Sequence, residues 1–346
     1  MTRLHRPEPV LNHQAAPVDM RTPPWEAASQ LRDGKQLIVI DRYRTGATIL
    51  AQLQRLLPPA AGDASFAARR AARSTYRKAA MRLLAPIKVH KLALEGAPPI
   101  GFLKELYPDR ASFTLSFPDA QALNAAWGRY QTGHHFPVLG QRIHPFYGVY
   151  APTRSSHLEL FATWLSTYTG ARKRAADVGT GCGVLALMLG RAGFKNIVAT
   201  DINPNAIESV TRELARLESP PNIEPRCCDL LTGTGESDLI VFNPPWVQGD
   251  IESPLDQALY FEAGLFERFF DQAIARLADG GRIVVLFSSV LELVQPDVPH
   301  PIETELERGR LVCVSKLRRK VRPPADARGN RRRTRERVEV WELALA

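Results

Sequence analysis

Three glycines at alternate positions are the most chemically suggestive feature of the chain. They are Gly179, Gly181 and Gly183 of "DVGTGCGVLAL", and they follow an apolar run and precede a helical pattern. Glycine lets a backbone turn tightly and approach a ligand without obstruction by a Cβ atom, and the start of the next helix offers unpaired N–H groups. The spacing differs from the Gly-x-Gly-x-x-Gly of dehydrogenases. We therefore predict a ligand-binding loop that begins at Asp177.

Two carboxylates follow the next two predicted strands. Asp201 ends "IVATD", and Asp229 comes after "NIEPRC". An acid after the second strand can accept hydrogen bonds from both hydroxyls of a ribose, and the carboxyl ends of parallel strands form one ligand-binding edge. Asp229 is placed to meet an adenine amino group. The pattern predicts a nucleoside cofactor site, and the alternative is an ordinary turn with acids in solvent.

The segment "DLIVFNPPW" ends a fourth buried strand at a rigid corner. Asn243 offers a side-chain oxygen as a hydrogen-bond acceptor. Pro244 and Pro245 fix the backbone on its carboxyl side, and Trp246 offers a flat face for a planar group. We interpret the corner as a pre-aligned acceptor site with a stacking surface. The alternative is an Asn-Pro-Pro turn with a tryptophan in the core.

The elements that must position these residues alternate between strand and helix from about residue 147 onward. Apolar strands such as "RAADVG", "NIVATD", "DLIVF" and "GRIVVLF" are separated by helical patterns, one of them the long run "LYFEAGLFERFFDQAIARLAD". Such alternation predicts an α/β fold, a seven-stranded, mostly parallel Rossmann-like sheet with helices on both faces. The final pair, "RLVCVSK" and "RVEVWELAL", has no helix between its strands. The last strand should therefore run antiparallel.

The chain of 346 residues is long enough for two domains. We predict a flexible, proline-rich tail over residues 1–22, a smaller, mainly helical N-terminal domain over 23–140 for substrate recognition, and the α/β domain over 141–346. "TGATILAQLQRLLPP" has helical spacing, whereas "SFTLSF" alternates like a short strand. The sequence does not indicate which fold the N-terminal domain adopts.

Composition bears on metal binding, membrane association and the location of the protein. The four cysteines have no Cys-x-x-Cys spacing and no histidine in ligand register, so we expect no metal site. No apolar run approaches the roughly 18 residues of a membrane helix, and the first residues lack the apolar stretch of a secretory signal. We expect a cytoplasmic protein without a membrane partner. The oligomeric state is not indicated.

Positive charge is concentrated in two segments. Residues 68–91 hold eight Lys or Arg and no acid, and residues 316–337 hold eleven against two acids, so the rest of the chain is acidic although the total net charge is +9. This arrangement favours contact with a polyanion such as RNA. The candidate contacts are Arg69, Arg70, Arg73 and Arg77 on one helical face, and Arg331, Arg332 and Arg333 in the loop between the last two strands. A solvated helix face and a solvated loop are the alternatives.

The motifs "DVGTGCG", "VATDINP", "CCDLL" and "FNPPW", in this order and spacing, resemble the class I S-adenosylmethionine-dependent methyltransferases, and more narrowly the HemK/PrmC-like, small-methyltransferase-domain group with its Asn-Pro-Pro-aromatic motif. The resemblance covers about residues 145–346 and implies S-adenosyl-L-methionine as the cofactor. It places the three glycines around the methionine portion, Asp201 on the ribose and Asp229 near the adenine. Asn243 would line the cofactor and act in catalysis with the rest of its motif. The chain reads "APTRSSH" where the PrmC version has a Pro-Arg-Pro-Glu-Thr-Glu run.

Three functions remain open on this basis. The first is N-methylation of an exocyclic amine of a nucleic-acid base, most of all in RNA, which the basic segments favour. The second is the same chemistry on a protein glutamine or a small natural product, although the departure from the PrmC run speaks against glutamine. The third is a non-catalytic nucleotide- or RNA-binding protein on a methyltransferase scaffold. An intact glycine loop together with Asn243 argues against the third.

Overall fold

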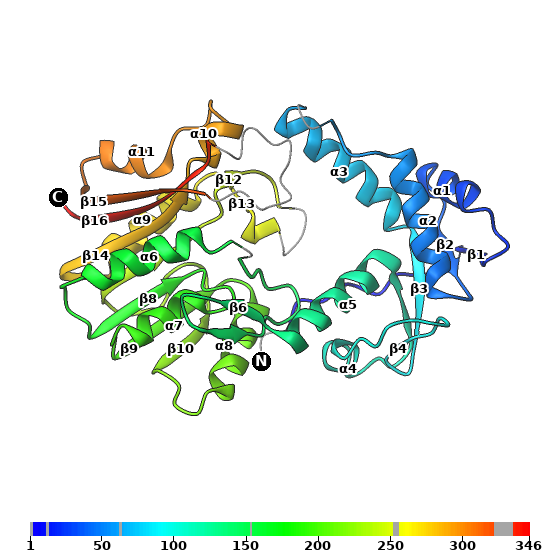
Figure 1. The fold of residues 1–346 in the computed structure, drawn as a ribbon, viewed down its shortest axis with the longest axis horizontal. Coiled ribbons are helices and arrows are strands. Elements are labelled where there is room, and N and C mark those ends of the chain that lie inside the picture. The colour runs from blue at the N-terminus through cyan, green and yellow to red at the C-terminus, as the bar shows by residue number, and fades with distance from the viewer. Residues whose placement is uncertain (1–2, 12–13, 62–63, 153, 252–255, 322–334) are drawn as a thin grey trace. The chain divides into compact units, whose positions relative to one another are not determined.

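The computed structural model describes residues 3–11, 14–61, 64–152, 154–251, 256–321 and 335–346. The chain forms two compact units, Leu4–Gln131 and, together with Arg3, Thr132–Ala346, drawn in Figure 1. None of the helices within those ranges has the combination of length and apolarity that a membrane crossing demands.

The N-terminal unit combines helices with a five-stranded sheet in the order β1-β2-β3-β4, with β5 paired to β3. Its strands are β1 (Ala16–Val18), β2 (Leu37–Val39), β3 (Leu83–Lys88), β4 (Lys91–Leu92) and β5 (Phe113–Ser116). Its helices are α1 (Pro24–Arg32), α2 (Tyr43–Leu56), α3 (Phe66–Ala80), α4 (Phe102–Leu106) and α5 (Phe117–Thr132). Helices account for more of its residues than strands do. The predicted helix and the predicted strand are present as α2 and β5.

The prediction of a flexible tail over residues 1–22 is wrong for the described part of that segment. Residues 16–18 form β1, which pairs in parallel with β2. Further toward the N-terminus, Val10 donates its backbone N–H to the Thr114 carbonyl at 2.8 Å, and the Tyr107 hydroxyl donates to the Pro7 carbonyl at 2.5 Å. Prolines cannot donate backbone hydrogen bonds, but their carbonyls accept them, so a proline-rich segment can still be fixed to a core.

The second unit is built on a seven-stranded sheet in the order β10-β9-β8-β11-β14-β16-β15. Its strands are β8 (Arg174–Val178), β9 (Asn196–Asp201), β10 (Ile223–Cys227), β11 (Ser237–Phe242), β14 (Leu277–Ser288), β15 (Leu311–Lys320) and β16 (Arg337–Leu345). All pairings are parallel except those of β16, which runs antiparallel to β14 and β15. The predicted fold class and the antiparallel last strand are confirmed.

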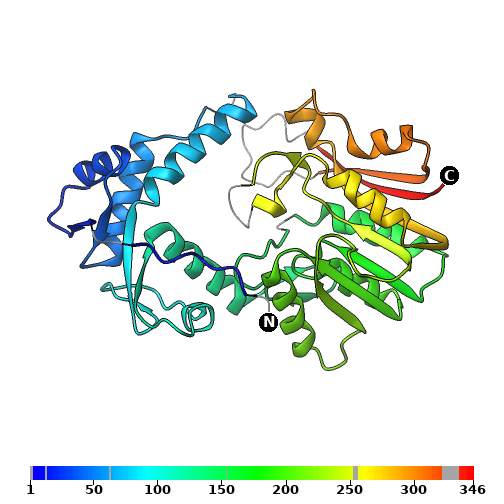
Figure 2. The same cartoon turned by 180° about the vertical axis from the view of Figure 1, so that it is seen from behind.

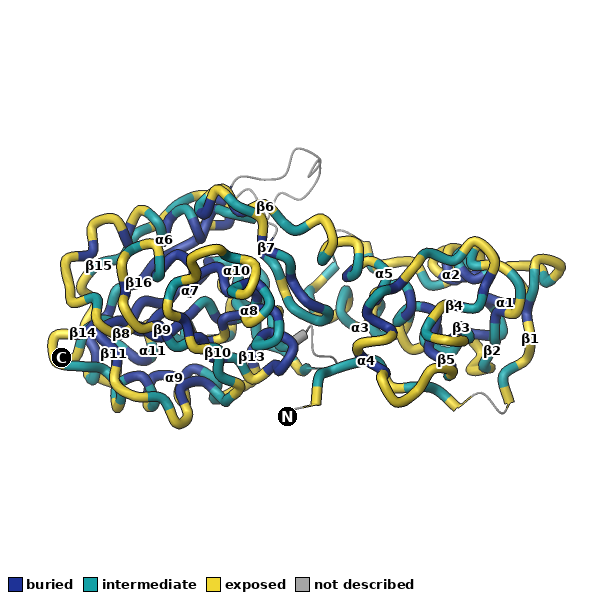
Figure 3. The backbone as a smooth tube through the Cα atoms, turned by 90° about the horizontal axis from the view of Figure 1, so that it is seen from below, coloured by how far each residue is buried: buried dark blue, intermediate teal, exposed yellow. Residues whose placement is uncertain are grey.

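Helices cover both faces of this sheet, because alternate residues of a strand point to opposite sides. Leu239 and Val241 pack in one core cluster with α6 (Ser156–Thr167) and α7 (Val184–Arg191). Ile240 and Phe242 pack in the other with α9 (Leu265–Ile274). Figure 2 shows α9 on the face opposite α6, and Figure 3 shows the central strands as largely buried. Strands buried on both faces explain the continuous apolar runs in the sequence.

The remaining elements of this unit precede the main strands or connect them. They are the hairpin β6 (His134–Phe136) and β7 (Gln141–Ile143), α8 (Pro204–Arg216), β12 (Val247–Gln248), η1 (Asp256–Ala258), β13 (Tyr260–Phe261), α10 (Val290–Val294) and α11 (Pro301–Glu307). The long helix predicted from residue 259 is wrong in its extent. Gly264, at φ +83°, caps a shorter helix α9, and β14 begins three residues after α9 ends.

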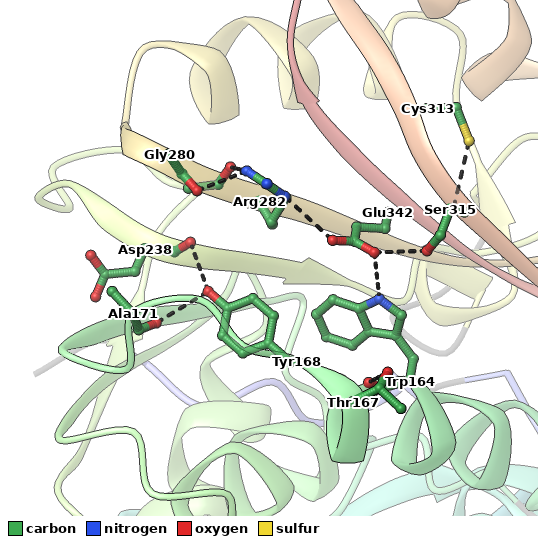
Figure 4. A network of polar contacts seen from close by, with 11 residues as sticks. Trp164, Thr167, Tyr168, Ala171, Asp238, Gly280, Arg282, Cys313, Ser315 and Glu342 are labelled. Carbon is green, nitrogen blue, oxygen red and sulfur yellow. Dashed lines mark hydrogen bonds and ion pairs between the residues drawn. The ribbon is translucent and has the colours of Figure 1, made fainter.

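A polar network fixes α6 to the sheet (Figure 4). The Trp164 indole N–H donates to Glu342 at 2.9 Å, and the Ser315 hydroxyl donates to the same carboxylate at 2.7 Å. Arg282 lies 3.3 Å from the other Glu342 oxygen. One carboxylate thus joins α6 to β14, β15 and β16, and this fixes the helix whose first turn borders the candidate site.

Candidate active site

The strand register brings the predicted site residues to one level of the sheet. Cys227 of β10 pairs with Asp201 of β9, Thr200 pairs with Val178 of β8, and Val178 pairs with Phe242 of β11. Asp201 and Asn243 are therefore level, with β8 between their strands, about 10 Å apart at 4.8 Å per strand. The chain order of the sheet reverses between β8 and β11, which is where open α/β sheets bind ligands.

The glycine loop needs its glycines for two separate reasons. Gly179, Gly181 and Gly183 have φ of +61°, +56° and +83°, a region that other residues rarely adopt. A Cβ on Gly183 would also lie 3.0 Å from Val210, and one on Gly179 would lie 3.3 Å from Phe242. The loop can therefore hold backbone atoms close to a ligand in a way that substituted residues could not.

Asp177 supports this loop through hydrogen bonds to two of its neighbouring residues. Its Oδ2 accepts hydrogen bonds from the Thr180 hydroxyl at 2.6 Å and from the Ala186 N–H at 2.9 Å. Burial raises its pKa to about 7, and the two hydrogen bonds only partly offset that effect. Within the described part of the chain, its other oxygen is buried without a hydrogen-bond partner. Asp177 is thus positioned to shape the loop.

Asp201 faces the loop from the neighbouring strand. Its Oδ2 accepts the N–H of Gly181 at 2.9 Å, and its Oδ1 accepts the N–H of Asn203 at 2.8 Å. Burial raises the pKa of this carboxyl, and the backbone hydrogen bonds act in the opposite direction. An ionised carboxylate offers about four acceptor sites, so two protein hydrogen bonds leave capacity for two hydroxyls. The observed contacts therefore fit a ribose.

Asp229 is in a more open setting. Its side chain is 43% exposed and lies 3.7 Å from the Arg268 guanidinium of α9. The next residue, Leu230, has φ of +50°, so the chain turns sharply after β10. Asp229 thus follows the third strand on the predicted edge, in contact with solvent and a cation.

Asn243 has a hydrogen-bond acceptor that the described protein groups leave unpaired. Its side-chain oxygen is buried, and it has no hydrogen-bond partner among the described residues. Leaving a buried acceptor unpaired costs about 1–3 kcal/mol, a cost that an incoming N–H donor would remove. Pro244 is buried beside it. The corner therefore offers a rigid acceptor that protein groups do not satisfy.

Trp246 is anchored by one hydrogen bond and by one aromatic contact. Its indole N–H donates to the Leu286 carbonyl of β14 at 3.2 Å, and the His157 ring packs nearly perpendicular to it, with centroids 5.3 Å apart. The partly buried ring contacts both core clusters. Trp246 is consequently a packing residue as well as a candidate stacking surface, and its orientation is fixed by the sheet.

Sequence reasoning missed His157 and a set of polar residues after β9. His157 is 3% exposed, and burial lowers its pKa to about 4. Asn203, Asn205, Ser209 and Glu213 are also buried. Only the Asn-Pro start of α8 gave a signal, since Asn203 is a typical N-cap. The others are found only through contacts between distant segments.

Of the two predicted groups of basic residues, only one lies within the part of the chain that the structure describes. Arg69, Arg70, Arg73 and Arg77 lie on α3 of the N-terminal unit, as predicted for a helix. Arg331, Arg332 and Arg333 lie outside the described residues. The segments that flank them end β15 and begin β16, and Val321 donates its N–H to the Glu336 carbonyl at 3.0 Å. Since β15 is parallel to β14 and β11, its carboxyl end at Lys320 lies at the same edge as Asn243.

Comparison with known proteins agrees with this geometry. Residues 148–313 match the family model of the methyltransferase small domain. A Methanocaldococcus jannaschii protein, provisionally named a protein N5-glutamine methyltransferase, is 31% identical over 157 residues, 43% of this chain and 76% of that protein. The ribosomal protein uL3 glutamine methyltransferase of Xanthomonas campestris is 32% identical over 126 residues, 35% of this chain and 41% of that protein.

Among solved structures, the ribosomal protein L11 methylase of Lactobacillus delbrueckii subsp. bulgaricus is 19% identical, with a TM-score of 0.40 over 57% of this chain and 81% of that one. The sheet order, the glycine loop, the family match and the extent of the M. jannaschii alignment lead to one conclusion. The chain belongs to the class I S-adenosylmethionine-dependent methyltransferases, in the HemK/PrmC-like group that carries the methyltransferase small domain.

Proposed function

We propose that this enzyme methylates the nitrogen of a planar amide or amine, and that Asn243 selects and orients that nitrogen. The buried, unpaired side-chain oxygen of Asn243 carries the proposal, because it is an acceptor in need of an N–H donor. Amide and exocyclic amine nitrogens bring such donors, whereas thioethers do not. The family membership supports an enzyme over a non-catalytic binding protein.

S-adenosylmethionine, when bound, supplies an electrophilic methyl group on a sulfonium. For the chain's own residues, the task is to hold the acceptor nitrogen with its lone pair toward that methyl. The Asn243 oxygen and a backbone carbonyl of the Asn-Pro-Pro turn would accept the two N–H bonds of the substrate. This draws electron density onto the nitrogen and needs no strong base if the proton leaves late. Because the prolines fix the backbone, the acceptors are aligned before the substrate arrives.

The cofactor would lie along the edge that Asp201 and the glycine loop form. Asp201 has two acceptor sites left for the ribose after its bonds to Gly181 and Asn203. Gly179 and Gly183 keep the loop free of side chains that would collide with their surroundings. Asp229, exposed at the next strand end, is placed for the adenine amino group. These assignments extend the family resemblance to individual residues and are themselves proposals.

The first candidate acceptor is the side-chain amide of a glutamine in a protein. Two relatives have names that describe glutamine methyltransferases, at 31% and 32% identity. A primary amide offers two N–H donors on a planar group, which matches the two acceptors of the corner.

The second candidate is an exocyclic amine of an RNA base, which has the same donor geometry. It is favoured by α3, where Arg69, Arg73 and Arg77 follow one another at helical spacing and form a cationic row. Under this proposal the N-terminal unit recognises the substrate, and the second unit performs the transfer.

Methyl transfer to fractionated acceptors distinguishes the candidates. Purified enzyme would be incubated with methyl-labelled S-adenosylmethionine and extracts separated into RNA, protein and small molecules, with Asn243→Ala as the matched inactive control. Label that depends on Asn243 and is recovered as methylglutamine supports the first candidate, and label in a methylated base supports the second. Label only on oxygen or sulfur would overturn the proposal of a nitrogen acceptor.

A further inference from the structure

A row of buried polar side chains runs along one face of α8 and continues into the turn before it. Asn205, Ser209 and Glu213 recur at every fourth position, so they share one face of the helix. Asn203 caps the helix, since its side-chain oxygen accepts the N–H of Asn205 at 3.0 Å. Asn205 and Ser209 are fully buried, and Glu213 is 3% exposed. We call Asn203, Asn205, Ser209 and Glu213 the polar row. Apolar residues would be the usual choice at such positions.

Each member of the polar row bonds to the backbone of one segment, residues 144–148, which ends in a turn. Glu213 accepts the N–H of His144 at 3.0 Å, and Ser209 accepts the N–H of Phe146 at 3.1 Å.

The other two members of the polar row donate hydrogen bonds to carbonyls of the same segment. Asn205 donates to the Tyr147 carbonyl at 2.8 Å, and Asn203 donates to the Gly148 carbonyl at 3.1 Å. The contacts advance along the segment as they move toward the start of α8, so the row sets the position of the segment residue by residue.

The polar row and the segment both contact the residues proposed to bind the cofactor. Asn203 donates its own N–H to Asp201, and Asp201 also holds Gly181. Two residues beyond the segment, the Tyr150 carbonyl lies 3.6 Å from where a Cβ of Gly181 would be. The chain that the polar row holds therefore passes directly over the glycine loop. Gly148, at φ +71°, allows the turn that brings it there.

We propose that the polar row is a positioning device for cofactor binding, which holds residues 144–150 against the glycine loop and Asp201. The inference rests on the proposed placement of the ribose at Asp201. Buried hydrogen bonds would be a costly way to stabilise a helix contact that apolar residues could make. They are suited to fixing a backbone in one register, because every donor and acceptor must find its partner.

The test uses the full chain and measures S-adenosylmethionine and S-adenosylhomocysteine affinity by calorimetry, together with KM for the cofactor and kcat. Asn205→Asp replaces a donor by an acceptor at nearly constant shape, and Ser209→Ala removes one acceptor. Gly148→Ala strains the segment from its own side and leaves α8 unchanged. Thr211→Ala, at an exposed position of the same helix, is the matched control.

We expect Asn205→Asp and Ser209→Ala, through the loss of one hydrogen bond each, and Gly148→Ala, through backbone strain, to raise Kd and KM for the cofactor about fivefold to tenfold. At saturating cofactor, kcat should stay within about twofold, since the corner at Asn243 is untouched. Thr211→Ala should match the parent. A purely structural role would lower the melting temperature without this separation of KM from kcat. If Asn205→Asp fails to fold, Ser209→Ala and Gly148→Ala decide the outcome.

Asp201→Ala separates this inference from the proposed function. If Asp201→Ala loses cofactor affinity while folded variants of the polar row keep theirs, the positioning role is wrong and the proposed site stands. If Asp201→Ala binds the cofactor as the parent does, the proposed placement of the ribose is wrong, and the inference is overturned with it.

Discussion

The indole N–H of Trp246 donates a hydrogen bond to the backbone carbonyl of Leu286 at 3.2 Å, which ties the Asn-Pro-Pro-Trp corner to the neighbouring strand β14. The corner follows β11, and β11 pairs with β14 in parallel. The motif is therefore held at both ends, because Asn243 directly follows β11 and Trp246 is bonded to β14. A rigid turn held at both ends keeps the Asn243 oxygen in one place.

Trp246→Phe should test this anchoring. Phenylalanine keeps an aromatic ring against His157 but has no N–H for Leu286, so the free energy of unfolding should fall by about 1–2 kcal/mol. We expect kcat to fall up to about tenfold because Asn243 is held less precisely. Urea unfolding and steady-state kinetics measure the two effects. Unchanged values for both would mean that packing alone holds the corner.

Asn243→Ala should separate chemistry from cofactor binding. Removing one pre-aligned polar group is expected to lower kcat by about two to three orders of magnitude. Cofactor affinity should stay close to that of the parent, since the ribose and loop contacts are unchanged. Calorimetry with S-adenosylhomocysteine provides the control. Near-normal turnover in a folded variant would rule out the acceptor role of Asn243.

Much of the α/β unit could be predicted from the sequence because local patterns determine it. Strands buried on both faces leave continuous apolar runs, such as Leu239 to Phe242. The parallel order then forces Asp201 and Asn243 to one edge. The short strands β1 and β2 of the N-terminal unit span three residues each, which is too few for a readable period.

The contacts that complete the site depend on distant parts of the chain. His157 meets Trp246 only after α6 packs on the sheet. Ser209 contacts Phe146 across 63 positions of the chain. Burial also sets the pKa values of Asp177 and His157, and the sequence carries no measure of burial for a single polar residue. The sequence thus indicates the chemistry of the edge, whereas long-range packing determines its geometry.

Asp177 should make the protein less stable as the pH rises. Burial raises its folded-state pKa to about 7, above the ordinary value of 3.8. Between these two values the folded state binds more protons than the unfolded state, so stability falls as the pH increases through this window. Asp177→Asn removes this titration. Its stability relative to the parent should grow by up to about 1.4 kcal/mol per pH unit between pH 4 and 7.

Denaturant unfolding of both cofactor-free proteins at several pH values measures this difference. Asp279→Asn, at an exposed position of the same unit, is the matched control. A difference between Asp177→Asn and the parent that does not vary with pH would show that Asp177 keeps an ordinary pKa.

His157 should have the opposite effect. Burial lowers its folded-state pKa to about 4, below the ordinary value of 6.5. The unfolded state then binds the extra proton, so the contribution is present above pH 6.5 and is lost as the pH falls toward 4. His157→Phe keeps a ring against Trp246 and removes the titration. Relative to the parent, it should gain stability as the pH is lowered from 7 to 5, as unfolding curves at those pH values would show.

The cationic row of α3 should reveal the class of substrate through salt dependence. If Arg69, Arg73 and Arg77 neutralise phosphates, changing all three to glutamine should weaken RNA binding and reduce the slope of log affinity against log salt by about two to three units. Glutamine is a good helix former, so α3 should persist.

Lys35, Arg44 and Lys104 provide the control for that experiment, since they are exposed in the same unit outside residues 68–91 and changing them to glutamine removes equal charge. A general effect of net charge would reduce the slope equally in both triple variants, whereas a localised phosphate track would respond only to α3. S-adenosylhomocysteine affinity should be unchanged in both, because the cofactor edge belongs to the other unit. If the α3 variant binds RNA with the parent's slope, its arginines do not contact phosphates. Glutamine methylation then becomes the stronger of the two proposed activities.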